Sequence, residues 1–351
     1  MRSFLLLIVV CLISLSGLFG QSYKVLFIGN SYTEVNNLPQ MVADMAASNH
    51  DTISFQSYTP GGCTFQQHVS GAASYIQSGG WDYVVLQEQS QLPSFPIGQF
   101  MNESYPYAQQ LCEMIRQYNP NAHIVFYMTW GRKNGDQQNA VYYPPLGTYE
   151  GMDSLLYARY MMMAQDNQAW VCPVGYVWHR IRDQYPSIEL YAADESHPSL
   201  AGTYAAACSF YTVLFQKDPT QITYETSLDH TTTQIIRDAV RQNVFDSLAR
   251  WFVVTDSMPD TDSTAVTSHT ASNIQIQYNV SNGQLEIATD PVLPSQITLY
   301  SLQGQCLWQT KLSGQEAHVS LPVGLKSTGV YIVRYDDRNG SVTRKIFIPS
   351  L

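Results

Sequence analysis

The sequence predicts an α/β fold, a parallel sheet with helices on both faces, followed by a small all-β sandwich. Two observations predict it. From Tyr23 to about Val174, short apolar runs alternate with amphipathic stretches of helical period. From Ile274 onward the runs are short, alternate between polar and apolar residues, and are separated by turn signals. Strands that alternate with helices form parallel sheets, whereas closely spaced alternating strands form antiparallel ones.

The first 20 residues predict an export signal. Arg2 supplies a positive start, Phe4 to Leu15 form an apolar core, and small residues lead to Gln21. A membrane anchor is the alternative, but a bilayer span needs about 20 apolar residues and no later segment qualifies. We therefore expect no membrane span, and a secreted or cell-surface protein that is exported through the periplasm.

Charge and cysteine content exclude several classes of function. The chain has 18 Lys and Arg against 28 Asp and Glu, a net charge of -10, which becomes -11 when Arg2 is removed. This acidic balance without a basic tract argues against nucleic acid or an anionic membrane as partner. Five cysteines remain after residue 20, widely spaced and without a C-x-x-C pair, so no zinc site is indicated. One disulfide and buried free thiols both stay open.

The first part of the chain predicts five strands and several helices. The strands are expected at Tyr23–Gly29, Ile53–Tyr58, Tyr83–Gln87, Ile124–Thr129 and Ala169–Val174, and the helices at Leu38–Ser48, Phe65–Gln77, Tyr105–Tyr118, Met152–Gln165, Tyr176–Gln184, Ser199–Phe215 and Thr232–Phe252. Sites in such sheets collect beyond the carboxyl ends of the strands. Ser31, Gln87 and Trp130 fall at such ends, and Gly61-Gly62 lies in the loop after the second strand.

A change of composition follows Phe252. The segment from Asp256 to Thr264 is polar and acidic without apolar period, which predicts a linker over residues 254–272 between a domain at 21–253 and a β-sandwich at 273–351. Asn282-Gly283 and Asn339-Gly340 are hairpin signals. The sandwich strands are expected at Ile274–Tyr278, Gln284–Ala288, Gln296–Tyr300, Cys306–Lys311, His318–Leu321, Gly329–Tyr335 and Thr343–Ile348.

Two distant stretches carry the chemistry. The first strand ends in Gly29-Asn30-Ser31, and Asp194 stands three residues before His197 in Asp194-Glu195-Ser196-His197-Pro198. Ser, His and Asp that converge in space form an activated nucleophile, its base and the group that orients the base. Taken alone, Ser31 is about equally well explained as a helix N-cap. Glu195 is the alternative orienter, at a poorer spacing to His197.

These blocks resemble the SGNH/GDSL hydrolases, esterases and lipases on a flavodoxin-like sheet. The G-D-S block appears as Gly29-Asn30-Ser31 and the D-x-x-H block as Asp194 to His197. The resemblance covers roughly residues 23–217 and implies Ser31, Asp194 and His197 as the catalytic triad. The G-x-S-x-G pattern of α/β-hydrolases is absent, because Thr33 stands where its second glycine would be.

The resemblance also implies an oxyanion hole from the backbone N–H groups of Ser31 and Gly62. The third conserved block of the family, G-x-N-D, is altered here, since this chain has Leu86-Gln87-Glu88-Gln89-Ser90 at that place. Counting residues places Gln89 at the Asn position, whereas related carbohydrate acetylesterases favour Gln87. Both glutamines stay open as the side-chain donor.

Three further polar or aromatic residues are candidates for substrate binding. Trp130 and Arg132 follow the fourth strand and could line a sugar subsite, and His68 lies one helical turn past Thr64. Ordinary loop packing explains the first two about as well, and a structural hydrogen bond explains His68 better. The insertion around 142–145 is expected to cap the pocket. We expect no metal and no cofactor.

The C-terminal part resembles the sorting domain of cargo of the Bacteroidetes type IX secretion system. The matching residues are those at 297–305, Leu321, the run at 329–334 and Lys345. The secretion machinery is then a partner; a carbohydrate-binding or spacer module is the alternative. Together the residues predict a secreted serine esterase that removes acetyl or similar small acyl groups, on carbohydrate. The alternatives are a non-catalytic carbohydrate-binding protein on the same scaffold, or a lipase or thioesterase.

Overall fold

The computed structural model describes residues 20–253 and, in the C-terminal part, seven strands within residues 275–348. The chain divides into two units, Met1–Asp256 and Ser257–Leu351. The expected signal segment up to residue 19 and the expected linker lie outside the described residues. Each unit is described by itself below.

A parallel sheet of five strands in the order β2-β1-β3-β4-β5 forms the centre of the first unit, as predicted. Its strands are β1 (Ser22–Ile28), β2 (Thr52–Tyr58), β3 (Tyr83–Leu86), β4 (His123–Tyr127) and β5 (Trp170–Cys172). Residues 25–28 of β1 and all of β3 are buried, because both strands lie inside the sheet with a helical layer on each face. Parallel strands covered on both faces are expected to be continuously apolar in this way.

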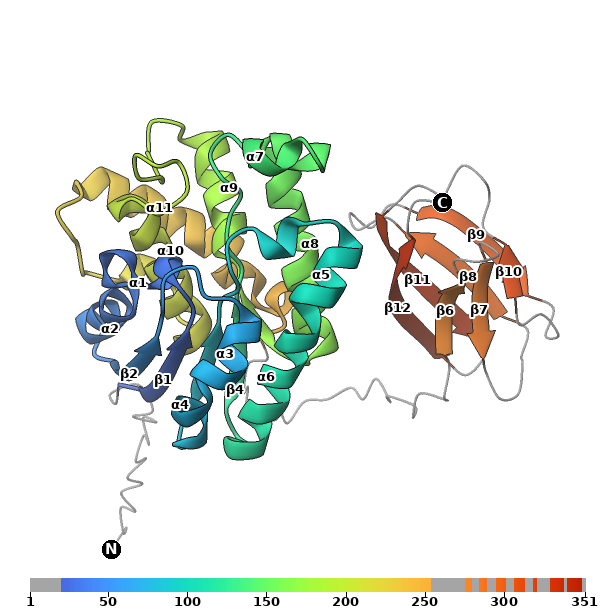
Figure 1. Cartoon of the computed structure of the whole chain (residues 1–351), viewed down its shortest axis with the longest axis horizontal. Coiled ribbons are helices and arrows are strands. Elements are labelled where there is room, and N and C mark those ends of the chain that lie inside the picture. Colours follow the sequence, from blue (N-terminus) through green and yellow to red (C-terminus); the bar gives the residue numbers. More distant parts are fainter. Residues whose placement is uncertain are drawn as a thin grey trace, which may run out of the picture. The chain divides into compact units, whose positions relative to one another are not determined.

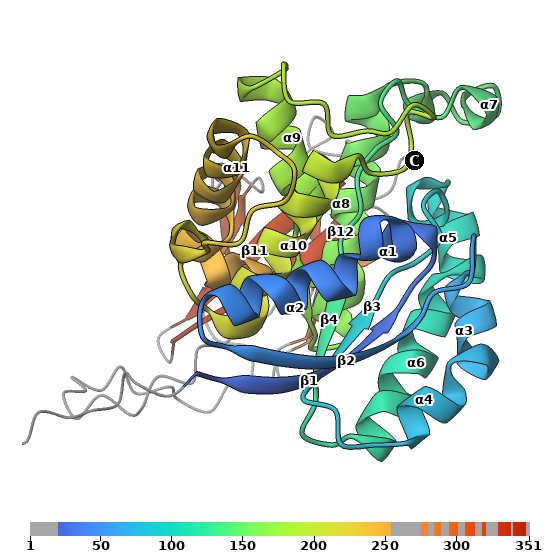
Figure 2. The same cartoon turned by 90° about the vertical axis from the view of Figure 1, so that its left-hand side faces the viewer.

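Helices cover both faces of the sheet (Figures 1 and 2). One layer contains α2 (Leu38–Ser48), α10 (Leu200–Phe215) and α11 (His230–Asn243), with α9 (Val174–Gln184) packed against α10 and α11. The other contains α3 (Phe65–Gly71), α4 (Ala73–Gln77), α5 (Ile97–Glu103), α6 (Tyr105–Tyr118) and α8 (Tyr149–Asp166). Every residue of α10 from Ala201 onward is buried, so this helix forms the core between its neighbours.

Short helices that the periodicity did not predict lie at the loops. They are α1 (Ser31–Glu34), α5 and α7 (Gln137–Ala140), together with 3-10 turns at Val35–Asn37, Leu92–Ser94, Pro144–Gly147 and Pro219–Gln221. The helix expected over 232–252 is divided between α11 and a 3-10 segment at Phe245–Trp251. The helix expected over 65–77 is divided between α3 and α4. Gly71 ends α3 where the ring of Tyr58 approaches so closely that a Cβ would meet its hydroxyl at 2.3 Å.

The second unit contains two antiparallel sheets, in agreement with the predicted sandwich. One has the order β10-β7-β6 and the other β12-β11-β8-β9. The strands are β6 (Gln275–Asn279), β7 (Gln284–Ala288), β8 (Ser295–Tyr300), β9 (Cys306–Leu312), β10 (His318–Ser320), β11 (Gly329–Asp337) and β12 (Gly340–Ile348). The pairs β6–β7 and β11–β12 are antiparallel neighbours, as the two Asn-Gly signals predicted. Asn282, Gly283 and Asn339 themselves lie outside the described residues.

Candidate functional site

The turn between β1 and α1 presents Ser31 at the carboxyl edge of the sheet. The side chain of Asn30 caps α1 by accepting the N–H of Tyr32 at 3.2 Å. Ser31 is therefore the first residue of a helical turn, where a backbone N–H has no intrahelical acceptor and remains free for another one. The N-cap function that the sequence left open for Ser31 is carried out by Asn30.

A second turn, between α9 and α10, presents Asp194 and His197, the predicted acid and base. Asp194 Oδ1 accepts the backbone N–H groups of Ser196, at 3.1 Å, and His197, at 2.9 Å. Backbone hydrogen bonds from Ala192 to the carbonyl of His197 and from Glu195 to that of Ala192 close the turn. Glu195 has φ +61° and its carboxylate accepts from Asn134, so it does not orient His197.

The structure brings Ser31, His197 and Asp194 together. Ser31 Oγ lies 2.8 Å from His197 Nε2, and the other ring nitrogen of His197 is hydrogen-bonded to Asp194 Oδ2. The His197 and Asp194 side chains remain 34% and 50% exposed, so the pair opens to solvent. Partial burial opposes ionisation of Asp194, but hydrogen bonds from His197 and from two backbone N–H groups outweigh it and hold its pKa below the usual value.

A stack of aromatic rings in the core packs beneath the turns that carry Ser31 and His197. The fully buried indole of Trp130 stacks on Tyr32 at 4.8 Å and on Trp178 at 3.7 Å between ring centroids. Trp130 Nε1 donates to the carbonyl of Ser196 at 3.0 Å, and the Tyr32 hydroxyl lies 2.6 Å from Ser196 Oγ. Trp130 thus holds the turn of His197 from within the core. The prediction that it lines a substrate subsite is wrong, because the ring has no exposed surface.

Gln87 is also excluded as an oxyanion donor. It is fully buried under the turn that carries Ser31, where its side-chain oxygen accepts from Asn30 N and Thr33 Oγ1, each at 2.9 Å. Its amide nitrogen donates to Asn30 Oδ1 at 2.9 Å and to the carbonyl of Glu88. Both amide hydrogens are used, so none is left for a substrate. A Cβ on Gly29 would meet Gln87 Oε1 at 2.7 Å, which is why glycine stands there.

Gly62 and Gln89 remain as oxyanion candidates beside Ser31. Gly62 lies at an exposed turn with φ +67°, a conformation that favours glycine. The next residue, Cys63, is tied to the turn that carries Ser31, since Asn30 Nδ2 donates to the carbonyl of Cys63 at 3.1 Å. Gln89 is half-buried, and its amide nitrogen has one hydrogen bond in the described part of the chain, to Gln91 at 3.2 Å. One N–H of Gln89 is therefore available.

The other two substrate candidates differ in exposure. The side chain of Arg132 is 29% exposed and forms an ion pair with the carboxylate of Asp136 at 3.6 Å. His68 is fully buried, with its Nδ1 3.6 Å from Cys63 Sγ and its ring against Tyr58. Burial lowers the pKa of His68 to about 4. The prediction that His68 faces the cleft is wrong; it belongs to the core, as its alternative explanation held.

Glu88 is a residue that the sequence reasoning did not single out. It follows β3 with no exposed surface, and its carboxylate accepts the N–H groups of Phe65, at 2.8 Å, and Gln89, at 2.7 Å, on one oxygen. The other oxygen accepts the hydroxyl of Ser104 at 2.6 Å. Burial raises the pKa of Glu88 to about 7 in spite of these hydrogen bonds. An acidic residue two positions after a fully apolar strand was the available signal.

A depression of about 410 Å³ adjoins the segments that carry Gly62 and Gln89. Its lining comes from α3, α5 and the loop after β3: Thr64, Gln66, Gln89, Gln91, Leu92, Phe95 and Glu103. The lining combines amide groups with one aromatic ring and contains neither Lys nor Arg. It is far larger than an acetyl group, so it suits the alcohol portion of an ester better than a small acyl group.

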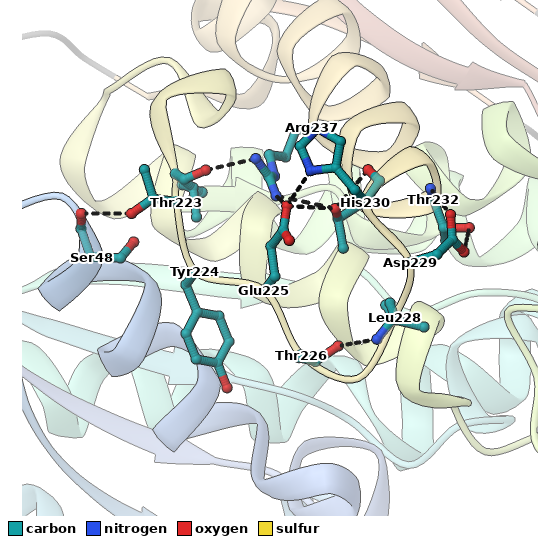
Figure 3. Close-up of polar contacts among 12 residues, drawn as sticks. Ser48, Thr223, Tyr224, Glu225, Thr226, Leu228, Asp229, His230, Thr232 and Arg237 are labelled. Carbon is teal, nitrogen blue, oxygen red and sulfur yellow. Dashed lines mark hydrogen bonds and ion pairs between the residues drawn. The ribbon is translucent and has the colours of Figure 1, made fainter.

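A second polar cluster, drawn in Figure 3, lies beyond the C-terminal end of α2. Glu225 accepts from His230 at 2.6 Å and from Arg237 at 2.8 Å, and the buried Arg237 also donates to the carbonyl of Ile222 at 2.7 Å. Thr223 Oγ1 donates to the carbonyl of Ser48, the last residue of α2. These bonds tie the segment between α10 and α11 to the body of the unit, and they explain the cluster without a ligand.

In the part of the chain that the structure describes, the cysteines and acidic groups form neither a disulfide nor a metal site. Cys63, Cys112, Cys172 and Cys208 are free and buried, so the disulfide alternative fails for the cysteines of residues 20–253. No group of three or more His, Cys, Asp or Glu side chains in the described part of the chain could hold a metal ion. Among the helices that the structure describes, none combines the length and the apolar character of a bilayer span.

Comparison with known proteins bears on both units. Residues 268–349 match the family model described as secretion system C-terminal sorting domain, which confirms the resemblance seen in the sequence. No curated protein matches the chain. Solved structures that are similar to it include proteins described as an SGNH hydrolase from Slackia heliotrinireducens and a GDSL-like lipase from Parabacteroides merdae.

Three solved structures give the extent of the similarity. A DUF4886 family protein from Bacteroides uniformis is 18% identical, with a TM-score of 0.55 over 64% of this chain and 95% of its own. An acetylxylan esterase from Geobacillus stearothermophilus is 15% identical, with a TM-score of 0.38 over 59% and 97%. The esterase EstA from Pseudoalteromonas is 12% identical, with a TM-score of 0.42 over 55% and 97%. The TM-score of 0.55 shows that the first unit has the fold of the Bacteroides uniformis protein, and the C-terminal segment matches a secretion system sorting domain.

Proposed function

We propose that the first unit is a serine esterase whose nucleophile is Ser31. The observation that carries the proposal is the alignment of Ser31 Oγ, 2.8 Å from His197 Nε2, with a ring whose other nitrogen is held by Asp194. A hydroxyl is a weak nucleophile until a base within hydrogen-bond reach can take its proton. The three groups come from two turns that are 163 residues apart or more in sequence, at the edge where sites on such sheets lie.

In the proposed reaction, Ser31 Oγ attacks the ester carbonyl while its proton passes to His197 Nε2. Asp194 keeps the imidazole in the required tautomer and stabilises the imidazolium that forms. The proton then passes to the leaving alcohol as the bond between the acyl carbon and the alcohol oxygen breaks. Water attacks the acyl-enzyme, gives its proton to His197, and releases the acid and Ser31.

The negative charge that develops on the carbonyl oxygen is proposed to be stabilised by three N–H donors. These are the backbone N–H groups of Ser31 and Gly62 and the side-chain amide of Gln89. Fixed donors aimed at this oxygen are commonly worth about 10²–10³ in rate each. Among the two glutamines that the sequence left open, only Gln89 has a donor to spare.

For the substrate we propose an ester of a small acyl group, acetyl or similar, on a carbohydrate. The depression beside Gln89 supports this class, because amide groups and the ring of Phe95 suit a polyhydroxylated alcohol and the lining contains no cation. Arg132 is a further substrate contact in this proposal. The sorting domain supports export to the cell surface or the medium, with the secretion machinery as partner and the periplasm as route.

The experiment uses p-nitrophenyl acetate and acetylated polysaccharides. The wild type should hydrolyse the acetyl ester, and Ser31→Ala should lower kcat by at least about 10³-fold without changing the thermal unfolding midpoint. Ser74→Ala, which changes an exposed serine of α4, is the matched control and should retain the activity. Activity close to wild type in Ser31→Ala would refute the assignment. A folded wild type that binds glycans but hydrolyses no ester would favour the non-catalytic alternative.

A further inference from the structure

Glu88 links all three segments that build the proposed oxyanion hole. Its carboxylate accepts the N–H of Phe65, the first residue of α3, which fixes the loop that carries Gly62. The same oxygen accepts the N–H of Gln89. The backbone carbonyl of Glu88 accepts from Asn30 Nδ2 at 3.3 Å, next to Ser31. One buried residue therefore contacts the nucleophile turn, the Gly62 loop and the Gln89 segment.

The surroundings of Glu88 make these contacts rigid. Ser104, itself fully buried, donates its hydroxyl to the second carboxylate oxygen and prevents rotation of the group. The Tyr160 hydroxyl accepts the backbone N–H of Glu88 at 3.3 Å. Within the described residues no Lys, Arg or His forms an ion pair with Glu88. The Glu88 side chain is thus held by hydrogen bonds alone, and burial strengthens such bonds.

A buried acid without a cation is costly to keep, because desolvation of a carboxylate is unfavourable. A leucine of similar size would fill the same space without that cost. The acid is therefore explained best by what its two oxygens hold in place. A shift of about 1 Å in catalytic groups can cost about 10²-fold in rate, so an anchor beneath two donors has a large effect on turnover.

We propose that Glu88 is a positioning residue that holds the Gly62 loop and Gln89 at the distance from Ser31 that an oxyanion requires. The inference rests on the proposed esterase function. Glu88 is out of contact with the substrate, and it acts through the backbone N–H groups of Phe65 and Gln89. It should therefore affect kcat and leave substrate binding almost unchanged.

The test compares Glu88→Leu with Glu88→Gln on p-nitrophenyl acetate. Glu88→Leu removes both acceptors and should lower kcat by about 10–100-fold, with KM within about threefold of wild type. Glu88→Gln keeps an oxygen for the two N–H groups and presents its amide to Ser104, so kcat should stay within about threefold. Rescue by glutamine distinguishes a positioning role from a requirement for charge.

Asp51→Leu is the matched control. Asp51 is another buried carboxylate that accepts a backbone N–H, from Gln21 at 2.8 Å, but it precedes β2 at the opposite edge of the sheet. Its replacement should lower the unfolding midpoint and leave kcat unchanged at a temperature where the variant is folded. An equal loss of kcat in Asp51→Leu and Glu88→Leu would show a general effect of destabilisation and overturn the proposal.

Amide hydrogen exchange provides a readout that does not need activity. In Glu88→Leu the peptides that contain Phe65 and Gln89 should exchange at least about tenfold faster, whereas those of α10 should not change. If the wild type hydrolyses no ester but the exchange rises as expected, the esterase proposal fails and the anchoring by Glu88 stands. Unchanged exchange, or unchanged kcat in folded Glu88→Leu, would overturn the role of Glu88.

Should Glu88→Leu fail to fold, Ser104→Ala decides. This variant removes the bond that stops the carboxylate from rotating and leaves its other two contacts in place. It should lower kcat by about threefold with KM unchanged, and an unaltered kcat would count against the proposal.

Discussion

Replacement of Trp130 by Phe tests whether this ring acts on the substrate or on the turn of His197. Trp130 has no exposed surface and lies between Tyr32 and Trp178, so phenylalanine keeps an aromatic ring in the stack. The substitution removes the indole N–H that donates to the carbonyl of Ser196 at 3.0 Å. Ser196 is the neighbour of His197, and the Trp130→Phe change therefore loosens the turn that aligns the base.

Two contributions determine how much stability Trp130→Phe loses. The lost hydrogen bond costs about 1 kcal/mol in the free energy of unfolding. The smaller ring leaves a partial cavity in the core, for which about 1–2 kcal/mol is reasonable, because complete truncation of a large aromatic residue costs about 3–5 kcal/mol. We expect a loss of about 2–3 kcal/mol in stability and, from the displaced imidazole, a fall in kcat of about tenfold.

The assay measures denaturant unfolding together with kcat and KM for p-nitrophenyl acetate. Trp178→Phe is the matched control, since Trp178 stacks on the other face of Trp130 and donates to the carbonyl of Gly202 rather than to the catalytic turn. It should lose comparable stability with a smaller fall in kcat. A rise in KM at unchanged kcat in Trp130→Phe would refute this reasoning and return Trp130 to a substrate subsite.

Two further predictions follow from the buried groups. Gln89→Ala should lower kcat by about 10²-fold at an unchanged unfolding midpoint. Gln87→Ala should cost about 2–4 kcal/mol in the free energy of unfolding, because it leaves the N–H of Asn30 and the hydroxyl of Thr33 without an acceptor. The reverse pattern in kinetics and unfolding would contradict the assignment of the two amides. His68, whose folded pKa of about 4 lies below the usual 6.5, should destabilise the protein in acid. The unfolded chain binds the proton first, so stability is complete above pH 6.5 and falls as the pH drops to 4, by about 3 kcal/mol. Unfolding of His68→Gln at pH 7 and at pH 4.5 should show a shallower decline than wild type, and an equal decline in both proteins would exclude this contribution.

Much of the fold could be predicted because its signals are local. The apolar run before Gly29 and the alternation of strands with helical stretches are set by neighbouring residues, and β1, α2 and α6 agree with the sequence to within one residue. The short helix at Ser31–Glu34 could not be found in this way, because four residues carry no periodicity. Its cap, Asn30, is held by bonds to residues 33 and 58 positions away.

For the candidate site too, some residues could be predicted from local sequence and others only from the tertiary structure. The sequence by itself supplied Asp194 and His197, because a tight turn joins residues three apart, and it supplied Ser31 as the residue after the first strand. Only the tertiary structure separated Gln87 from Gln89. The amide nitrogen of Gln87 donates to Asn30, which follows another strand, whereas that of Gln89 donates to Gln91 and keeps one free N–H. Burial of Trp130 and His68 and the contacts of Glu88 likewise depend on packing between layers. Residue type and spacing report which chemistry is available, but the exposure of a side chain is a property of the whole fold.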